Sequence, residues 1–303
     1  MHRRPTVLHF VPYASEEMLR KALVLRADAL VLDLEDSVTP DNKESARKTV
    51  SEWLRHADFP RQKRLVRING LDSDLGIPDV EAVMAGRPDG LLVPKAGDLQ
   101  ALRELDSLMS RLEKAHGYPE RTVELFPIIE TPLGVLHARE IALCPRVVAL
   151  CGGRGGLDMA AALGAWQIRR DNGELLDIFR LTGMMCLLAA TAAGVQPIDS
   201  ILLLGDLDRM RRECRESAEM GCTGWITIHP SQIDVVHQVC FPSAEEVAES
   251  RELADAFEEN RKSGKWAFRF KGQMVDVPNL KRAQTILDRA RLKQELDAEW
   301  KRP

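Results

Sequence analysis

The sequence predicts a (β/α)8 barrel of the TIM type followed by a C-terminal extension. Along its 303 residues, short apolar runs alternate with longer amphipathic segments, a pattern typical of a parallel sheet covered by helices. Eight such runs are present, the number at which a parallel sheet closes into a barrel. An open doubly wound sheet is the alternative. It is disfavoured because no Gly-x-Gly-x-x-Gly follows the first run and the chain does not divide into two halves.

The first apolar run, residues 7–12, predicts a strand, and residues 15–26 predict a helix with Ser15 as its N-cap. The other strands are expected at 29–34, 64–68, 90–94, 124–129, 147–150, within 196–204 and at 224–228. Helices between them are expected at 43–54, 99–116, 133–143, 159–165, 175–193 and 207–220.

The pattern changes near residue 240, so we expect a barrel over residues 1–240 and an extension over 241–303. The extension contains two charged helical segments, 243–260 and 279–295. A hairpin-like stretch around Lys271 and Gly272 lies between them. This arrangement is not another strand–helix unit, so the sequence predicts an appendage to the barrel.

Composition excludes several classes of partner. The net charge of −4 favours neither nucleic acid nor an anionic membrane as a partner. No apolar run approaches the roughly 20 residues of a membrane helix, and the N-terminus lacks the features of a signal peptide. The six cysteines form no Cys-x-x-Cys pair, which favours reduced thiols and a cytoplasmic protein.

Two carboxylates at neighbouring strand ends indicate a metal site. Glu130 ends an almost wholly apolar strand, and Asp158 follows a glycine-rich turn after the next one. Neighbouring strands of a barrel lie about 5 Å apart, so the two side chains could share one cation. Two carboxylates that leave room for water and a chelating substrate suit Mg²⁺. For Asp158 alone, capping of the following helix is an equal alternative.

Basic residues and glycines occupy other strand ends, where barrel enzymes place their chemistry. Arg67 could clamp a substrate carboxylate, or pair with the acidic run Asp33-Leu34-Glu35-Asp36. Lys95 is a candidate for substrate binding, with a salt bridge at the barrel mouth as the alternative. The glycine-rich loop with Arg154 and Gly155 could bring the backbone close to a ligand or a metal.

The ordered set of motifs resembles the citrate lyase β-subunit-like branch of the HpcH/HpaI aldolase/citrate lyase superfamily. The motifs span about residues 10–286 and are Asp33-Leu34-Glu35-Asp36-Ser37-Val38, Lys43 with Arg47, Val66-Arg67-Ile68-Asn69, Pro94-Lys95, Ile129-Glu130-Thr131, Ile228-His229-Pro230-Ser231-Gln232-Ile233 and Gly272-Gln273-Met274-Val275-Asp276-Val277-Pro278. Each motif is weak by itself, but their order along the chain is specific to this branch.

The resemblance implies a TIM barrel, Mg²⁺, CoA thioester substrates, and trimers or hexamers. It assigns Glu130 and Asp158 to the metal and Arg67 to the oxo-acid. Asp276 would be an acid/base that reaches a neighbouring subunit's site. The chain departs from the family pattern at Tyr13, Arg154 and Leu157. There, relatives usually carry Gly, an aromatic residue and Glu, so we expect a reshaped acyl or CoA pocket.

The resulting hypothesis is reversible cleavage of a 3-hydroxyacyl-CoA thioester into an acyl-CoA and an oxo-acid. Glu35 and Asp36 would orient waters on the metal. Lys43 and Arg47 could bind CoA phosphates or be solvated helix charges. Two alternatives remain at this stage, a metal aldolase that uses a free 2-oxo or 2-hydroxy acid without CoA, and a non-catalytic binding homologue.

Overall fold

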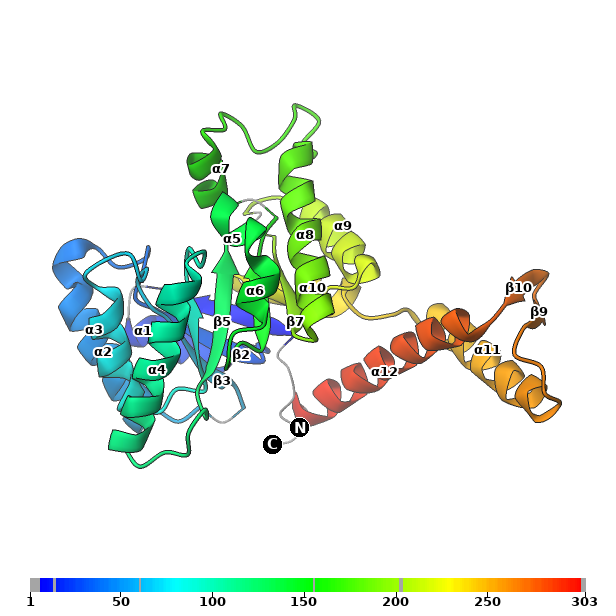
Figure 1. The fold of residues 1–303 in the computed structure, drawn as a ribbon, viewed down its shortest axis with the longest axis horizontal. Coiled ribbons are helices and arrows are strands. Elements are labelled where there is room, and N and C mark those ends of the chain that lie inside the picture. The colour runs from blue at the N-terminus through cyan, green and yellow to red at the C-terminus, as the bar shows by residue number, and fades with distance from the viewer. Residues whose placement is uncertain (1–5, 13–14, 60, 155, 202–203, 301–303) are drawn as a thin grey trace. The chain divides into compact units, whose positions relative to one another are not determined.

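The structure, a computed structural model, describes residues 6–12, 15–59, 61–154, 156–201 and 204–300. It divides into two compact units, Met1–Val236 and His237–Pro303 (Figure 1). Tyr13 and Gly155, both named in the sequence predictions, lie outside the described residues.

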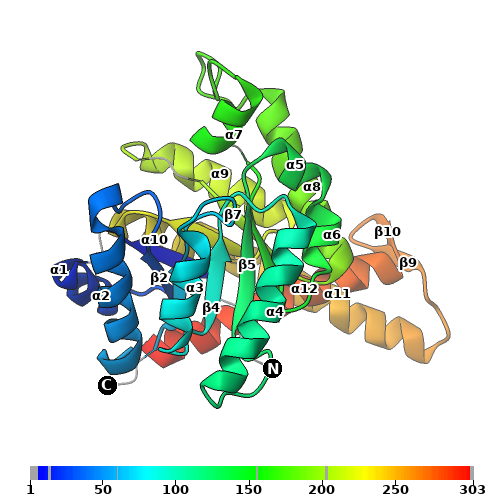
Figure 2. The same cartoon turned by 60° about the vertical axis from the view of Figure 1, so that its left-hand side comes forward.

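The first unit is a closed barrel of eight parallel strands, which confirms the predicted fold (Figures 1 and 2). Each strand pairs with the next along the chain, and β8 pairs with β1 to close the barrel. The strands are β1 (Val7–Val11), β2 (Ala29–Asp33), β3 (Lys63–Arg67), β4 (Gly90–Val93), β5 (Glu124–Ile129), β6 (Ala149–Gly152), β7 (Gln196–Ser200) and β8 (Gly224–Thr227).

Helices follow the strands and surround the barrel (Figure 2). They are α1 (Glu16–Leu23), α2 (Lys43–His56) after a short 3-10 turn (Pro40–Asn42), α3 (Gly76–Met84), α4 (Leu99–Ala115), α5 (Pro132–Leu136), α6 (Ala138–Ala142), α7 (Leu157–Leu163), α8 (Asp177–Ala193), α9 (Leu207–Met220) and α10 (Pro230–Val239). The sequence patterns did not predict α3 and α10. In the described part of the chain, no helix combines the length and the apolar character needed to cross a membrane.

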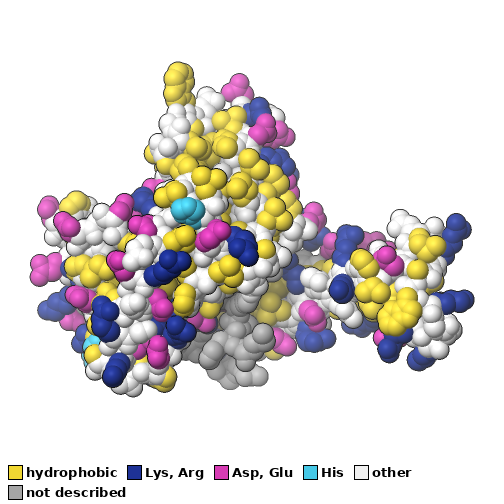
Figure 3. All heavy atoms as spheres, in the orientation of Figure 1, with side chains coloured by type: hydrophobic (Ala, Val, Ile, Leu, Met, Phe, Trp, Pro, Cys, Tyr) yellow, Lys and Arg dark blue, Asp and Glu magenta, His cyan; other side chains and the backbone are white. Residues whose placement is uncertain are grey.

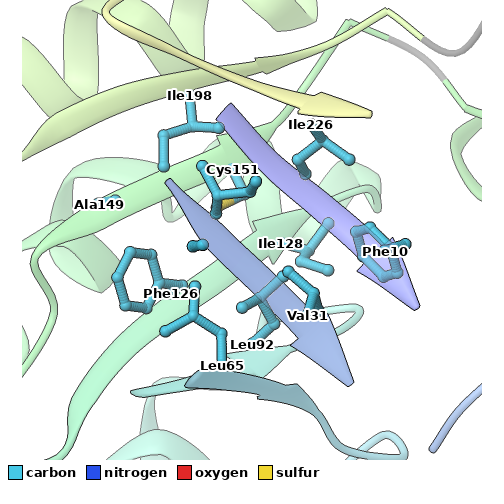
Figure 4. Close-up of a cluster of buried hydrophobic side chains, with 12 residues drawn as sticks. Phe10, Val31, Leu65, Leu92, Phe126, Ile128, Ala149, Cys151, Ile198 and Ile226 are labelled. Atoms are coloured by element: carbon cyan, nitrogen blue, oxygen red, sulfur yellow. The ribbon is translucent and has the colours of Figure 1, made fainter. Parts of the chain in front are cut away.

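Alternate side chains of the strands fill the barrel with an apolar core (Figure 4). Since successive strand residues point to opposite faces, this core fixes which positions face inward. Inward-facing pairs include Ala29 and Val31 on β2, and Phe126 and Ile128 on β5. The next inward position after each pair lies at the carboxyl end of its strand.

Opposite that end, a buried ion network ties α4 to the amino end of β6. Arg146 directs its guanidinium at Asp106 (2.5 Å) and Glu113 (2.8 Å), and Arg146 and Glu113 have no exposed side-chain surface. Glu113 also accepts the backbone N–H groups of Arg121 and Val123. Burying charge is tolerated when every partner is present, and removing one partner leaves an uncompensated charge, so the fold is expected to be sensitive to the loss of either member of this network.

Substituting Arg146→Met should cost about 3–5 kcal/mol of unfolding free energy, because Glu113 would remain buried without its counter-charge. Urea denaturation measures this loss. The control is Arg121→Met, since the Arg121 side chain is mostly exposed and 3.8 Å from Asp106. We expect it to cost less than about 1 kcal/mol. Equal losses in the two variants would contradict this expected sensitivity to the loss of a buried partner.

The second unit consists of two helices and a hairpin. Helix α11 (Ala244–Lys262) begins with a capping box between Ser243 and Glu246. Strands β9 (Phe268–Phe270) and β10 (Gln273–Val275) pair antiparallel, and α12 (Val277–Trp300) follows. The turn residues Lys271 and Gly272 both have positive φ values, 45° and 84°, as a two-residue hairpin turn requires. Asp276 is exposed between β10 and α12.

Candidate active site

The carboxyl ends of β2 to β6 bring together most of the residues singled out in the sequence. Asp33 and Arg67 are register partners on β2 and β3. Both occupy the inward position that follows the apolar core residues Val31 and Leu65. Glu130 has the same relation to Ile128 on β5. The period of two along each strand therefore directs these three charged side chains into the mouth of the barrel.

Asp33 and Arg67 form a bidentate ion pair. Nε and Nη2 of Arg67 donate to Oδ1 and Oδ2 of Asp33, each at 2.7 Å. Burial alone would raise the pKa of Asp33, but Arg67 outweighs it and holds that pKa below its usual value. Burial alone would also lower the pKa of Arg67, yet the acidic neighbours raise it. Arg67 is thus a fixed, permanent cation, with its guanidinium over the Phe10 ring.

Glu35 lies between the two cations of the site. It is 2.8 Å from Nη1 of Arg67 and 2.9 Å from Nζ of Lys95. Burial nevertheless raises the pKa of Glu35, with Arg67 and Lys95 opposing the shift. Asp36 lies at the rim, mostly exposed, with its carboxylate 3.3 Å from Arg67. The acidic residues at the end of β2 and just after it therefore position Arg67 and Lys95. The ion pair between Arg67 and this acidic run is one of the two alternatives that the sequence offered for Arg67.

Lys95 links three acidic groups of the site. Its backbone has a φ of +50°, a left-handed conformation that is unfavourable for a residue with a side chain. In this conformation the Lys95 N–H donates to Oε1 of Glu130 at 2.8 Å. Its Nζ lies 3.4 Å from Oδ1 of Asp158 as well as beside Glu35. Burial alone would lower the pKa of Lys95, but these carboxylates raise it, so the side chain stays charged.

Glu130 and Asp158 are the candidate metal ligands. Burial raises the pKa of Glu130 to about 7, and the nearby charges of Asp158 and Glu35 add to the rise. Asp158 is the second residue of α7, whose N-cap position is Gly156, so the capping alternative does not hold. Ionising Glu130 is unfavourable because the group is buried and lies near the negative charge of Asp158. A bound cation would offset this electrostatic cost.

This donor set fits Mg²⁺. Among the described residues, no three Asp, Glu, His or Cys side chains converge to enclose a metal. Mg²⁺ does not need such a cage, because it is commonly held by one or two carboxylates and completes its shell with water and substrate oxygens. Asp158 is about one-third exposed, which leaves room for such ligands. Glu130 and Asp158 would hold the ion.

Lys43 and Arg47, predicted as candidates for CoA phosphates, are instead bound within the protein. All three hydrogen bonds of the Lys43 ammonium go to Leu34 O, Glu35 O and Asn69 Oδ1, each at 2.7 Å. Burial lowers the pKa of Lys43. Arg47 pairs with the buried Asp79 at 2.8 Å. These contacts hold the loops after β2 and β3 in place and leave no Lys43 donor for a phosphate.

Arg154 is not brought to the group formed by Arg67, Lys95 and Glu130. Its guanidinium pairs with Asp199 at 3.1 Å and approaches Glu216 on α9 at 3.9 Å. The backbone before it packs so closely on α8 that a Cβ on Gly153 would collide with Cys186. The sequence named Asp33 only as one possible partner of Arg67, and it assigned no role to Asp199 or to the conformation of Lys95. Asp33 has a detectable signal, since it is the inward register partner of Arg67.

A (β/α)8 barrel with a carboxylate pair and a clamped arginine at the carboxyl ends of its strands defines a metal-dependent barrel enzyme. The family model described as HpcH/HpaI aldolase/citrate lyase matches residues 6–230. The chain belongs to this family, which confirms the resemblance read from its motifs.

Similar proteins extend the match beyond the barrel. The chain is 33% identical to mouse mitochondrial citramalyl-CoA lyase, covering 92% of this chain and 83% of that protein. It is 34% identical to a (3S)-malyl-CoA thioesterase of Cereibacter sphaeroides, covering 93% of each. The crystal structure of CitE from Mycobacterium tuberculosis with magnesium, acetoacetate and coenzyme A is 33% identical, with a TM-score of 0.79. That match covers 94% of this chain and 97% of the other.

Proposed function

We propose that this protein is a Mg²⁺-dependent carbon–carbon lyase that cleaves, or in reverse forms, a 3-hydroxyacyl-CoA thioester. The observation that carries the proposal is the buried Glu130 with its raised pKa, set beside Asp158 and the clamped Arg67. The similarity to a citramalyl-CoA lyase, and to a CitE structure that contains magnesium and coenzyme A, supports this assignment.

In cleavage, the O–H bond of the 3-hydroxyl breaks, its proton passes to solvent, and its electron pair forms the carbonyl of the oxo-acid product. The electrons of the carbon–carbon bond move to the α-carbon of the thioester, which then takes a proton and becomes the acyl-CoA. A bound Mg²⁺ would supply Lewis-acid polarisation of the reacting oxygen. Arg67 binds the carboxylate of the oxo-acid part and stabilises oxyanion charge, because Asp33 already fixes its orientation.

The other acidic residues of the mouth have supporting roles in this scheme. Glu35 and Asp36 hold Arg67, and Glu35 also holds Lys95, so that both cations face the substrate. Lys95 adds positive charge near Asp158 and fixes Glu130 through its backbone N–H. Asp276 is the proposed proton donor to the α-carbon. It is exposed on the extension, and we propose that it acts in the site of a neighbouring subunit.

A homotrimer, or a hexamer of paired trimers, is the proposed assembly. Figure 3 shows hydrophobic side chains gathered over the face formed by α5, α6 and α8. The exposed apolar residues there include Leu136 on α5 and Leu181 and Leu188 on α8, exposed by 70%, 48% and 69%. Extended apolar surface of this kind marks contact sites between proteins, and a second copy of the chain is the proposed occupant.

Substituting Leu188→Glu should therefore dissociate the oligomer, because the new carboxylate would be buried in the interface. Light scattering coupled to size-exclusion chromatography measures the mass. Val24→Glu is the matched control, since Val24 is 78% exposed just after α1 and outside this face. The interface assignment fails if Leu188→Glu keeps the mass of the unmodified protein.

Binding of Mg²⁺ should depend on pH around neutrality. Because the pKa of Glu130 is raised to about 7, the metal-free site is mostly protonated below that pH, and the ion must displace the proton. Affinity should fall as the pH decreases through 7. Calorimetry in two buffers of different ionisation enthalpy should detect release of roughly one proton at about pH 6 and little at about pH 8.5. Proton release that is equal at both pH values would contradict Glu130 as a ligand.

The proposed activity is tested with a panel of malyl-, citramalyl-, methylmalyl- and citryl-CoA, with acyl-CoA products followed by mass spectrometry. Release of acetyl- or propionyl-CoA together with an oxo-acid would identify the substrate. Cleavage of free 2-hydroxy or 2-oxo acids alone would favour the aldolase alternative. Mg²⁺-dependent binding without turnover would favour a non-catalytic homologue. All six cysteines are buried thiols outside any disulfide, which supports the cytoplasm as the proposed compartment.

A further inference from the structure

A cavity lies outside the barrel wall, between α8 and α9. Its volume is about 310 Å³, which is within the range of small-molecule sites. The floor is formed by Leu150 and Pro197, which are register partners on β6 and β7. Leu187 on α8 and Met220 on α9 contribute apolar walls. Arg67, Lys95, Glu130 and Asp158 do not line this cavity, so it is separate from the candidate active site.

Most of the negative charge lining the cavity is already neutralised. Asp199 faces the cavity from β7, and burial raises its pKa while Arg154, at 3.1 Å, opposes the rise. The other paired acids of the lining are Glu213, 2.6 Å from Arg169, and Glu216, 3.0 Å from Arg180. Glu174 is the one lining carboxylate that has no ion pair among the described residues.

Two arginines of the lining lack a buried counter-charge within the described residues. Arg212 forms no hydrogen bond or ion pair within the described residues. Arg209 has one side-chain ion pair there, to Asp206 one turn earlier on the surface at 3.4 Å. The Arg209 guanidinium lies directly against Gly173, where a Cβ would collide with it. The cavity therefore combines an apolar interior with two guanidinium groups that have no buried counter-charge in the described part of the chain, and such a pair suits a carboxylate.

We propose that this cavity binds a small organic acid with one carboxylate and an unbranched apolar chain. The carboxylate pairs with Arg209 and Arg212, and the chain packs on Leu150, Leu187 and Met220. A dianion is disfavoured because Glu174 lies among the same lining residues. A cation is disfavoured because the remaining acids already have arginine partners.

The test is a titration of the full-length protein, labelled with ¹³C at the methionine methyl groups, with sodium hexanoate. We expect saturable shifts of the Met220 and Met184 methyl resonances, because both side chains line the cavity. Met159 follows Asp158 directly and reports on the barrel mouth, whereas Met109 on α4 reports on global folding. Hexylammonium has the same chain with the opposite charge, and it should produce no saturable shift.

Two variants separate charge from shape. Arg209→Gln with Arg212→Gln should weaken hexanoate binding at least tenfold, and Leu187→Trp should abolish it by filling the cavity. The Met109 resonance should be unchanged in both. Shifts of Met159 alone would place the acid in the active site and overturn the proposal. Absence of a saturable shift at Met220, or equal binding of hexylammonium, would also overturn it. None of these outcomes depends on lyase activity.

Discussion

Replacing Glu130 with Gln should lower kcat/KM by at least about 10²–10³-fold, because the site loses a carboxylate needed to hold the metal and polarise the reacting oxygen. The same substitution should make the metal-free protein more stable at alkaline pH. The pKa of Glu130 is raised to about 7, so ionising it disfavours the folded state as the pH rises from the unfolded pKa of about 4.5 to 7. This cost is as much as about 3 kcal/mol.

The Glu130→Gln variant can keep the hydrogen bond from the Lys95 N–H, since a Gln oxygen also accepts. Its urea denaturation in EDTA at about pH 8 should therefore show equal or higher stability. Glu124→Gln is the control at the opposite end of β5, where Glu124 pairs with Lys63 at 2.7 Å. It should retain activity. An inactive Glu130→Gln that is also less stable in EDTA would indicate a structural role for Glu130.

Replacing Arg67 with Met should abolish measurable cleavage and destabilise the fold. Asp33 is 2% exposed and accepts two hydrogen bonds from the Arg67 guanidinium. Its buried carboxylate would lose that partner, at a cost of about 3–5 kcal/mol. Arg67→Lys should lose about 10²–10³-fold in kcat/KM, because an ammonium cannot reproduce the planar, bidentate contact of a guanidinium with a carboxylate. Steady-state kinetics and urea denaturation measure the two effects.

Arg64 offers a matched control for Arg67 on the same strand. It lies near the amino end of β3, where its Nε is 3.3 Å from the carboxylate of Asp89, which is about one-third exposed. Arg64→Met should leave kcat/KM unchanged and cost less stability than Arg67→Met. If Arg67→Lys retained full activity, the role of Arg67 as the group that binds the oxo-acid would be wrong.

The barrel could be predicted because each strand is a short apolar run that ends in a polar residue. Asp33, Arg67 and Glu130 also follow from sequence, since they continue the inward period of their strands. Two helices, α3 and α10, were not predicted because of the residues in their first turns. Helix α3 contains Gly76 and Pro78 in its first turn, and α10 begins at Pro230. These residues resemble loop signals but are compatible with the first turn of a helix, where backbone N–H groups need no helical partner.

The orientation of Arg154 and the conformation of Lys95 depend on tertiary packing. Arg154 is turned toward Asp199 because Gly153 and Gly183 bring the loop after β6 against α8. The left-handed backbone of Lys95 is held by its hydrogen bond to Glu130 and its ion pair with Glu35. Neither the orientation of Arg154 nor the backbone conformation of Lys95 produces a periodic pattern in the sequence. The placement of Asp276 in a neighbouring site likewise depends on an assembly, and it remains a prediction.

The most direct test of metal-dependent cleavage is a removal and restoration experiment on one protein sample. The thioester cleaved in the panel is incubated with protein treated with EDTA, then with excess Mg²⁺, while acyl-CoA release is followed by mass spectrometry. Cleavage should stop in EDTA and return fully with Mg²⁺, and Glu130→Gln should not recover under the same conditions. Cleavage that continues in EDTA at an unchanged rate would contradict a metal site at Glu130 and Asp158.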